Sequence, residues 1–257
     1  MLLAIDIGNT NITLGLYRGE ELQSSWRIST RQTATADELA SVLIGLFAAQ
    51  SVLAADIDAV VAASVVPLLT PAVQEMARRY FGLEAMVIGP GVRSKIRILY
   101  DNPREVGADR IANAAAVAHK YGGPAIVVDF GTSVNYDVIN GNGDFIGGVL
   151  APGLESSLDA LVAQAARLHR VDLVAPAKVI GKSTVASLQS GLMWGVVAQV
   201  EGLVARIRSE LGEQAKVIAT GGQAAVVASL TPVIQYVDPQ LTLEGLRLIW
   251  QQNQIGG

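Results

Sequence analysis

Residues 1–17, MLLAIDIGNTNITLGLY, decide the fold. Apolar residues run into Asp6, a tight polar turn of Gly8, Asn9 and Thr10 follows, and a second strand-like run comes after the turn. A carboxylate at the tip of a buried strand can hold Mg²⁺ through water, and the N–H groups and polar side chains of such a turn can donate to phosphate oxygens. Gly8 lets the backbone come close to a ligand because it has no Cβ. The stretch is typical either of a phosphate-binding turn or of a β-hairpin with a capped turn.

A second copy of this turn lies in residues 125–148, AIVVDFGTSVNYDVINGNGDFIGG. A shift of 123 positions (129 − 6) places Asp6 on Asp129 and Thr10 on Ser133. Internal repeats mark duplicated structural units. We therefore expect two related domains that face each other, each contributing one phosphate-binding turn.

The predicted secondary structure follows the same plan in both halves. The first half reads as strands at 2–6, 11–17 and 21–28, a helix at 35–49, a strand at 57–65, a helix at 67–80 and a strand at 85–88. A helix over about 107–121 leads to strands within 125–151, helices from 153 and over 183–211, a strand at 215–219, a helix from 222, a strand at 233–236 and a helix at 241–252. This βββαβα order predicts an α/β protein of two tandem ribonuclease-H-like domains, mixed sheets flanked by helices, over residues 1–117 and 118–257. The strongest break signal near the boundary is Gly122-Gly123-Pro124.

The composition excludes several classes of protein. Of the 257 residues 51% are hydrophobic and 16% charged, and the net charge is −4 without a basic block, which argues against nucleic acid as a partner. No run reaches the roughly 18 apolar residues of a membrane helix, so the apolar excess suits a subunit interface instead. The absence of cysteine excludes disulfides and thiolate chemistry. The first residues lack the basic region of a signal peptide, and we expect a cytoplasmic location.

The two turns carry a resemblance to a known superfamily. Asp6-Ile7-Gly8-Asn9-Thr10 and Asp129-Phe130-Gly131-Thr132 resemble the two phosphate motifs of the acetate kinase, sugar kinase and actin superfamily. Neither turn contains a lysine, so a divalent metal and a monovalent cation must supply the positive charge that a P-loop lysine gives elsewhere.

A charged block follows the first half. Residues 100–110, YDNPREVGADR, bring Asp109 and Arg110 to the start of a predicted helix, beside Gly107 and Ala108, which leave room at the backbone. One interpretation is helix capping, because a carboxylate is stabilised at a helix N-terminus. The other is a carboxylate aimed at a substrate hydroxyl, with Arg110 in bidentate contact with an anionic group.

This block, continued by Ile111-Ala112-Asn113-Ala114 and joined by Ala219-Thr220-Gly221-Gly222, resembles the type III pantothenate kinases over nearly the whole chain. The resemblance implies ATP-dependent phosphorylation of the primary hydroxyl of pantothenate to 4'-phosphopantothenate, the first step of coenzyme A biosynthesis. It further implies Mg²⁺, a monovalent cation (potassium or ammonium), and a homodimer with shared active sites.

The resemblance also assigns residues. Asp109 is the implied proton acceptor, and the implied pantothenate contacts are Tyr100, Gly107, Ala108, Asp109 and Arg110, with Thr184 reaching pantothenate on the partner subunit. The implied ATP-binding residues are Asp6, Ile7, Gly8, Asn9, Thr10, Asn11, Ile12, Thr13 and Thr132. Asp129 is the implied ligand of the monovalent cation. Gly221 and Gly222 leave room for adenine or ribose against the backbone, although a tight turn alone would also require glycine.

Other motifs are weaker. Gly181-Lys182-Ser183-Thr184 lacks the first glycine of a P-loop, since position 176 is proline, and Ser183 is better interpreted as the N-cap of a long helix. That helix carries an apolar stripe, Leu188, Leu192, Val196, Val200 and Leu203, that suits either a core or a dimer interface. His119 and His169 have no partner at metal-ligand spacing, which favours solvated or interfacial positions.

The second turn departs from the family pattern, which continues with alanine and two threonines where this chain has Ser133-Val134-Asn135. Asn135 can still donate or accept a hydrogen bond, but Val134 removes a hydroxyl. The sequence as a whole leaves three functional hypotheses. They are the kinase, a ligand-binding accessory or regulatory member of the family without kinase activity, and a sugar or acetate kinase of the same superfamily.

Overall fold

The computed structural model describes residues 1–89, 91–165 and 167–254. Two units can be separated in it: unit 1 comprises Met1–His119 together with residues 240–254, and unit 2 comprises Lys120–Pro239. The predicted boundary near residue 117 lies close to the first junction. The predicted range 118–257 differs from unit 2 at its end, because the last helix belongs to unit 1.

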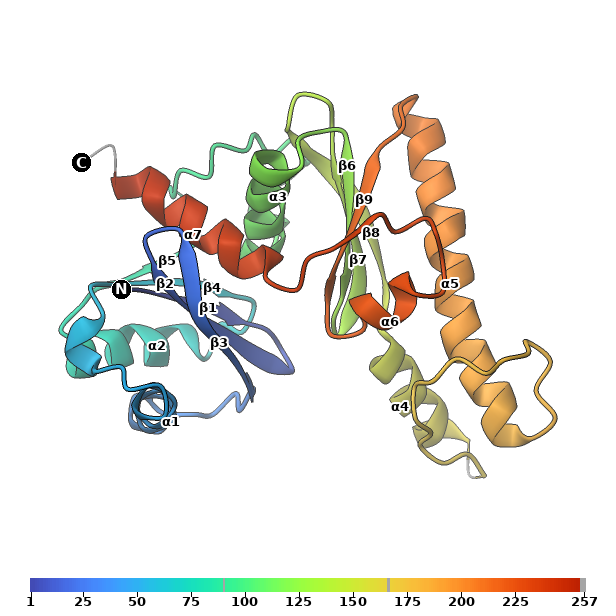
Figure 1. The fold of residues 1–257 in the computed structure, drawn as a ribbon, viewed down its shortest axis with the longest axis horizontal. Helices are drawn as coiled ribbons and strands as arrows, with labels where there is room; N and C mark the ends of the chain where they lie inside the picture. Colours follow the sequence, from blue (N-terminus) through green and yellow to red (C-terminus); the bar gives the residue numbers. More distant parts are fainter. Residues whose placement is uncertain (90, 166, 255–257) are drawn as a thin grey trace. The chain divides into compact units, whose positions relative to one another are not determined.

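Unit 1 is built on a mixed sheet with the strand order β3-β2-β1-β4-β5 (Figure 1). β1 pairs antiparallel with β2 and parallel with β4. The elements are β1 (Leu2–Ile7), β2 (Asn11–Arg18), β3 (Glu21–Ser29), α1 (Ala36–Ala48), β4 (Ala59–Ser64), α2 (Thr70–Met76), β5 (Ala85–Val87), α3 (Ala108–Lys120) and α7 (Leu241–Gln254), with 3-10 turns at Ala54–Asp56 and Pro103–Glu105 and a π-helical turn at Ala77–Phe81.

The strand alternation of β1 sends its side chains into two different cores. Leu3, Ile5 and Ile7 pack against the face covered by α1 and α2, and Leu2 and Ala4 pack against α3 and α7. The α3–α7 layer is tight, because a Cβ on Gly245 would lie 1.9 Å from the Ala112 carbonyl oxygen. The alanine-rich sequence of α3 and Gly245 of α7 therefore belong together, which explains why α7 returns to unit 1.

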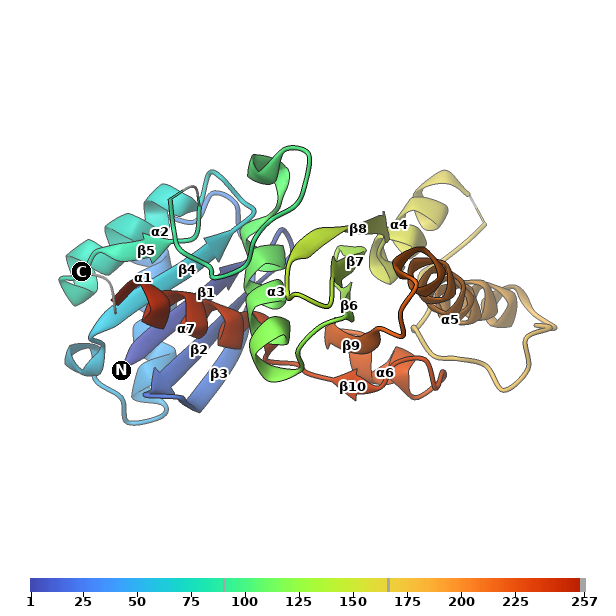
Figure 2. The same cartoon turned by 90° about the horizontal axis from the view of Figure 1, so that it is seen from above.

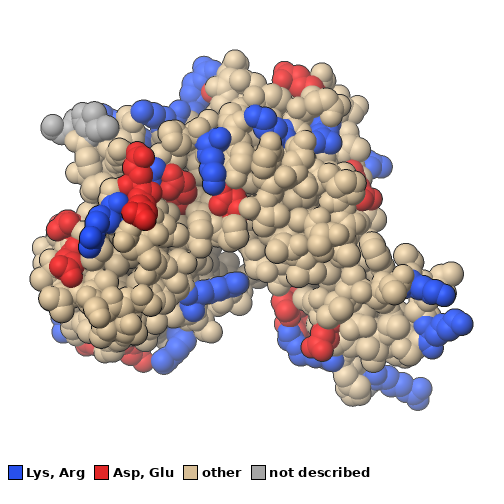
Figure 3. Space-filling model, viewed as in Figure 1, with Lys and Arg blue, Asp and Glu red and all other residues tan. Residues whose placement is uncertain are grey.

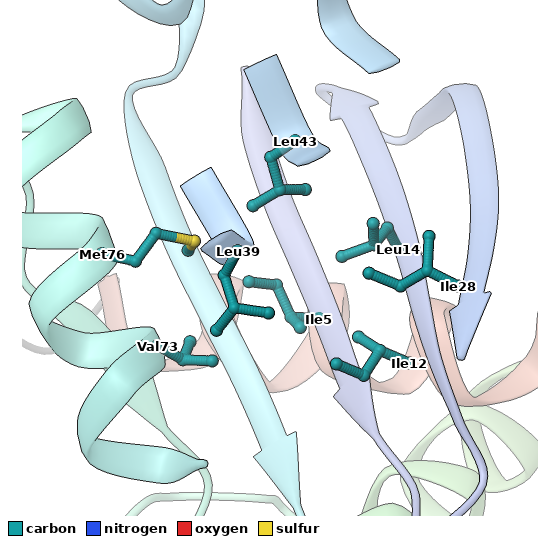
Figure 4. A pocket seen from close by; sticks show the side chains of 8 residues that line it. All are labelled: Ile5, Ile12, Leu14, Ile28, Leu39, Leu43, Val73 and Met76. Carbon is teal, nitrogen blue, oxygen red and sulfur yellow. The ribbon is translucent and has the colours of Figure 1, made fainter. Parts of the chain in front are cut away.

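A small apolar gap lies in the first of these cores (Figure 4). It is lined by side chains from three strands and two helices: Ile5, Ile12, Leu14, Ile28, Leu39, Leu43, Val73 and Met76. Since all of these side chains are apolar, the gap has no side-chain group that could bind phosphate or a metal. It is part of the packing between the sheet and α1 and α2.

The two helices of this face start differently from each other. Thr35 caps α1 in a capping box with Glu38, at the helix start that the sequence predicts. The predicted helix start at Pro67 is wrong, because α2 begins at Thr70 after a turn in which the Leu69 N–H donates to the Val66 carbonyl oxygen. A proline in the first turn of a helix loses no hydrogen bond, and here it is the proline that follows Thr70.

Unit 2 repeats the plan with the strand order β10-β9-β6-β7-β8. Its elements are β6 (Ala125–Phe130), β7 (Ser133–Ile139), β8 (Phe145–Pro152), α4 (Leu154–Gln164), α5 (Thr184–Leu211), β9 (Lys216–Gly221), α6 (Ala224–Ala228) and β10 (Tyr236–Val237). One core joins alternate residues of β6, β7 and β9 to α4, α5 and α6. Leu192, Val196 and Val200 of the predicted stripe on α5 are buried in it, which confirms core burial as one role of the stripe.

The two sheets share irregularities as well as strand order. The β2–β3 pairing shifts register between Leu16 and Tyr17, and the β7–β8 pairing shifts between Val138 and Ile139. These positions are 122 residues apart (138 − 16), one fewer than the separation of Asp6 and Asp129. The second turn is therefore shorter by one residue.

This difference corrects the alignment of the turns. The Gly8 N–H donates to the Asn11 carbonyl oxygen (3.0 Å), and the Gly131 N–H donates to that of Ser133 (2.9 Å). Ser133 is thus equivalent to Asn11, not to Thr10 as a single shift predicts.

Charged side chains of both signs are interspersed on the face drawn in Figure 3. Charged side chains of the protein form ion pairs within one unit, such as Arg79 with Asp37 (3.1 Å) and Arg170 with Glu155 (2.6 Å). Within the described ranges, no helix combines the length and the apolar character needed to cross a membrane.

Candidate active site

The first turn lies at the end of the central strand of unit 1. Asp6, the last polar residue of β1, is half-buried and in register with Thr13 of β2 and Ala63 of β4. Asn9 and Thr10 are exposed beyond it. In a sheet with parallel strands, ligands bind outside the carboxyl ends of these strands. The turn therefore has the position and the exposure that a phosphate site requires.

Not every residue of this stretch can offer its side chain to a ligand. Ile7 and Ile12 are 1% and 2% exposed and pack into the core under α1 and α2. They can contribute only backbone groups. The polar side chains available in residues 6–13 are those of Asp6, Asn9, Thr10, Asn11 and Thr13.

Gly107 brings Asp109 to the same edge of unit 1. A Cβ on Gly107 would lie 2.5 Å from Asp109 Oδ1 and 3.6 Å from Val65 Cγ1. Val65 follows β4, and its N–H donates to the Ile7 carbonyl oxygen (3.0 Å) just before the first turn. The Asp109 carboxylate is thus close to the strand ends that carry the turn, and the glycine is needed to make room for it.

Burial raises the pKa of the Asp109 carboxyl above its ordinary value of 3.8. The Arg110 N–H, which donates to Asp109 Oδ1 (2.8 Å), and the charge of Arg110 act in the opposite direction and only partly offset this effect. A carboxylate with a raised pKa is a stronger base than an exposed one. Helix capping alone would not require a carboxylate in a site that disfavours its charged form.

Two of the other predicted pantothenate residues, Gly107 and Arg110, lie next to Asp109. Gly107 ends the short segment before α3 and its carbonyl oxygen accepts from the Ile111 N–H (3.1 Å), so it serves as the backbone cap of the helix. Arg110 is buried, with 8% of its surface exposed, and Tyr100 is half-buried. A buried guanidinium beside a carboxylate is suited to bind an anionic group at a fixed place.

In unit 2 the second turn has a more polar surrounding than the first. Asp129 of β6 is in register with Asn135 of β7 and Thr220 of β9. Residues directly opposite each other in a sheet project to the same face, so a carboxylate, an amide and a hydroxyl form one row. The equivalent row of unit 1 has Thr13, Asp6 and Ala63.

Two glycines allow other segments to touch this edge. Gly221 has φ +90°, and a Cβ there would lie 2.5 Å from the Phe130 carbonyl oxygen and 2.7 Å from Asp129 Oδ1. A Cβ on Gly153 would lie 2.5 Å from the Thr132 carbonyl oxygen. The strand edge of unit 2 thus brings Asp129, Thr132 and Gly221 together, and their roles in binding a cation and ATP stay predictions.

The departure Ser133-Val134-Asn135 has a structural explanation. Val134 is 1% exposed and lies in the core with α4 and α5, on the face opposite to Asp129. Having Val134 where the family has a threonine therefore removes no hydroxyl from the row that contains Asp129. Asn135 does lie in that row, and its Oδ1 accepts from the Ser133 hydroxyl (2.7 Å).

The remaining candidates lie elsewhere. The first turn of α5, which carries the exposed Thr184, is apart from the strand edge of unit 2 (Figures 1 and 2), and Ser183 caps it as predicted by accepting from the Ala186 N–H (3.1 Å). His119 and His169 are exposed. Among the described residues, no group of three or more His, Cys, Asp or Glu side chains is arranged to hold a metal ion.

Thr30 was not among the candidates from sequence. Its hydroxyl donates to the Gly8 carbonyl oxygen (2.6 Å), and its N–H donates to the Thr10 carbonyl oxygen (2.9 Å). One signal in the sequence could have pointed to Thr30. The residue comes directly after the third predicted strand, where the chain passes the turn between the first and second strands.

A family model of the type III pantothenate kinases matches residues 2–206. The chain belongs to the type III pantothenate kinase family. A type III pantothenate kinase of Moorella thermoacetica is 50% identical over 253 residues, which are 98% of this chain and 100% of the relative. A type III pantothenate kinase of Frankia casuarinae is 51% identical over 254 residues, which are 98% of this chain and 100% of that relative. Geobacillus sp. has one that is 45% identical over 253 residues, with 98% of each covered.

Solved structures with low sequence identity support the fold. The inorganic polyphosphate/ATP-glucomannokinase of Arthrobacter sp. matches with a TM-score of 0.51 and 17% identity over 100% of this chain and 99% of that one. The ethanolamine utilization protein EutJ of Carboxydothermus hydrogenoformans matches with a TM-score of 0.57 and 15% identity. The match covers 96% of this chain and 89% of EutJ. These matches confirm the predicted fold class of two mixed sheets flanked by helices.

Proposed function

We propose that this type III pantothenate kinase transfers the γ-phosphoryl group of ATP to the primary hydroxyl of pantothenate, with Asp109 as the proton acceptor. The observation that carries the assignment of Asp109 is its half-buried carboxylate at the edge of unit 1 that holds the first phosphate turn. Family membership supplies the two substrates and the product, 4'-phosphopantothenate, at the first step of coenzyme A biosynthesis.

For ATP, the proposed ligands are the backbone and polar side chains of residues 6–13, with Thr132, Gly221 and Gly222. The exposure of Asn9, Thr10 and Thr132 supports this assignment. Phosphoryl transfer passes through a loose transition state, so the protein mainly places the reactants and neutralises charge. Backbone N–H groups in the turns contribute to both tasks.

The donors fit the expected cations. Mg²⁺ on a nucleotide keeps several waters and one or two carboxylates, and the half-buried Asp6 at the strand tip suits that role. The oxygens of Asp129, Asn135 and Thr220 suit a hard monovalent cation such as potassium. Bound cations neutralise the phosphate charge that no lysine of the turns can neutralise.

Pantothenate offers a carboxylate as a handle and a primary hydroxyl as the nucleophile. Arg110 is the proposed partner of the carboxylate, and Tyr100, Gly107 and Ala108 are further proposed contacts. Asp109 takes the proton as the hydroxyl attacks the γ-phosphorus, and a positioned base of this kind contributes typically about 10²–10⁴-fold to the rate.

A second copy of the chain is the proposed partner, with Thr184 contacting pantothenate bound to the other subunit. Apolar side chains near α5 support an interface there: Val179, Ile180 and Val185 are exposed, Ile180 by 83%. Patches of this kind mark protein–protein contacts. Sedimentation equilibrium should give the mass of two chains, and a single-chain mass at micromolar concentration would contradict the homodimer.

The activity is tested by mixing the protein with ATP, Mg²⁺, potassium and pantothenate. We expect ADP and 4'-phosphopantothenate to form in equal amounts. A coupled assay measures the ADP, and mass spectrometry measures the 4'-phosphopantothenate. Glucose and acetate in place of pantothenate should give no ADP above background. Replacing potassium by sodium should lower the rate of the wild type. The fall in rate should be smaller for Asp129→Asn than for the wild type. Binding of both ligands without product would contradict the kinase.

A further inference from the structure

Thr30 makes two hydrogen bonds to the first phosphate turn from outside it. It follows β3, which pairs with β2, and it is half-buried beneath the turn. Its hydroxyl holds the Gly8 carbonyl oxygen at 2.6 Å and its N–H holds the Thr10 carbonyl oxygen at 2.9 Å. Two of the peptide groups of the turn are thereby fixed through their oxygens.

The fixed oxygens determine where the neighbouring N–H groups point. A trans peptide is planar, and its N–H points in the direction opposite to its C=O. The peptides Gly8–Asn9 and Thr10–Asn11 are trans, since the cis bond among the described residues is Gly123–Pro124. Holding both oxygens toward Thr30 therefore directs the N–H groups of Asn9 and Asn11 away from β3.

In unit 2 the residue after the third strand also holds the turn, but here the hydroxyl bonds to the oxygen equivalent to that of Thr10, not to the one equivalent to that of Gly8. The Gly153 N–H donates to the Thr132 carbonyl oxygen (3.0 Å), which repeats the bond from the Thr30 N–H to Thr10. Gly153 has no hydroxyl, and a second bond to the Thr132 oxygen comes instead from the Ser156 side chain (2.7 Å). Each turn is thus held by the residue that follows the third strand of its unit, with one hydroxyl added.

We propose that Thr30 is a positioning residue for the triphosphate of ATP: its hydroxyl and N–H hold the carbonyl groups of the first turn away from the ligand, so that N–H groups face the phosphate oxygens. Without the hydroxyl, the Gly8–Asn9 peptide can rotate and present its oxygen to the phosphate, which repels it. This inference rests on the proposed function, since it takes ATP as the ligand of the turn. It adds a residue outside the 6–13 segment.

The test compares Thr30→Val with Thr30→Ser and with the exposed Thr33→Val. Valine has nearly the shape of threonine and keeps the backbone N–H, so it removes the hydroxyl alone. Calorimetric titration with Mg-ATP, without pantothenate and in potassium buffer, should show roughly five- to thirtyfold weaker binding for Thr30→Val. Thr30→Ser and Thr33→Val should bind Mg-ATP within about twofold of the wild type. The KM for pantothenate should stay unchanged in all three.

The outcomes separate this inference from the function. If the wild type and Thr30→Val bind Mg-ATP equally well, the positioning role of Thr30 is overturned and the proposed function is not. Equal losses for Mg-ATP and pantothenate in Thr30→Val, without recovery in Thr30→Ser, would overturn it as well, because they indicate a general structural role. Wild type that does not bind Mg-ATP would overturn the proposed function and this inference with it. If Thr30→Val does not unfold cooperatively, Thr30→Ala takes its place with the same criteria.

Discussion

Asp109→Asn should lower kcat by about 10²–10⁴-fold, because it removes the base that accepts the proton of the pantothenate hydroxyl. The dissociation constant for Mg-ATP should stay within about twofold, since the side chain is assigned to the acceptor and not to the nucleotide. Asparagine keeps an oxygen that can accept from the Arg110 N–H, so the start of α3 remains capped. Steady-state kinetics and calorimetric titration of Mg-ATP measure the two quantities.

The pH dependence gives a second measurement on the same residue. A base works in its deprotonated form, so kcat/KM of the wild type should fall as the pH is lowered through the raised pKa of Asp109, and that acid limb should be missing in Asp109→Asn. Burial disfavours the charged carboxylate in the folded state, so the free energy of unfolding at neutral pH should be no lower in the variant. Glu84→Gln, which removes an exposed carboxylate of unit 1, is the control and should match the wild type in rate. A parallel loss of Mg-ATP binding in Asp109→Asn would contradict the assignment as a base.

Gly221→Ala should weaken the strand edge of unit 2 and the binding of ATP together. The residue has φ +90°, and its Cβ would lie 2.5 Å from the Phe130 carbonyl oxygen and 2.7 Å from Asp129 Oδ1. The Phe130 oxygen is a backbone atom that accepts from the Gly222 N–H (3.0 Å), so no side-chain rotation can relieve this contact. We expect a loss of about 2–3 kcal/mol in the free energy of unfolding and a rise of at least about tenfold in the KM for ATP.

Gly212→Ala is the matched control for this prediction. Gly212 ends α5 with φ +67°, and a Cβ there would meet no atom within 4 Å. It should show only the conformational cost of a positive φ, about 1–2 kcal/mol, with an unchanged KM for ATP. Thermal or denaturant unfolding and initial rates at varied ATP compare the two variants. If Gly221→Ala behaved like Gly212→Ala in both measurements, close packing against Asp129 would not matter for ATP.

Much of the fold could be predicted because the local patterns agree with the tertiary structure. The run into Asp6 forms β1, the repeat beginning at residue 125 forms β6, a helix starts beside Thr35, and Ser183 caps α5 as expected. These features depend on alternation, capping residues and turn residues, which act over a few positions. The order of elements then allows few topologies.

The errors concern information that is not local. The amphipathic pattern predicts α7 but does not say which sheet it covers, and the answer depends on the fit of Gly245 against Ala112, more than a hundred positions earlier. A single shift aligned Thr10 with Ser133, because the loss of one residue in the second turn is visible only in the strand register. For the same reason the sequence did not show that Val134 faces the core.

The candidate site was predicted in part. The residues of the two turns and of the block at 100–110 stood out because glycine and carboxylates at strand ends and helix starts have few structural uses. Their grouping at the edge of each sheet follows from the topology. Thr30 escaped notice because a threonine after a strand has no local signature, and its bond to Gly8 joins positions that only the meander brings together.

The most direct test of the assigned chemistry is a crystal structure of the protein with a non-hydrolysable ATP analogue, Mg²⁺, potassium and pantothenate. We expect the primary hydroxyl oxygen of pantothenate within about 2.6–3.2 Å of an Asp109 carboxylate oxygen, the distance required for proton transfer to a base. A complex with both ligands ordered, in which Asp109 faces neither of them and another group holds the hydroxyl, would contradict the account.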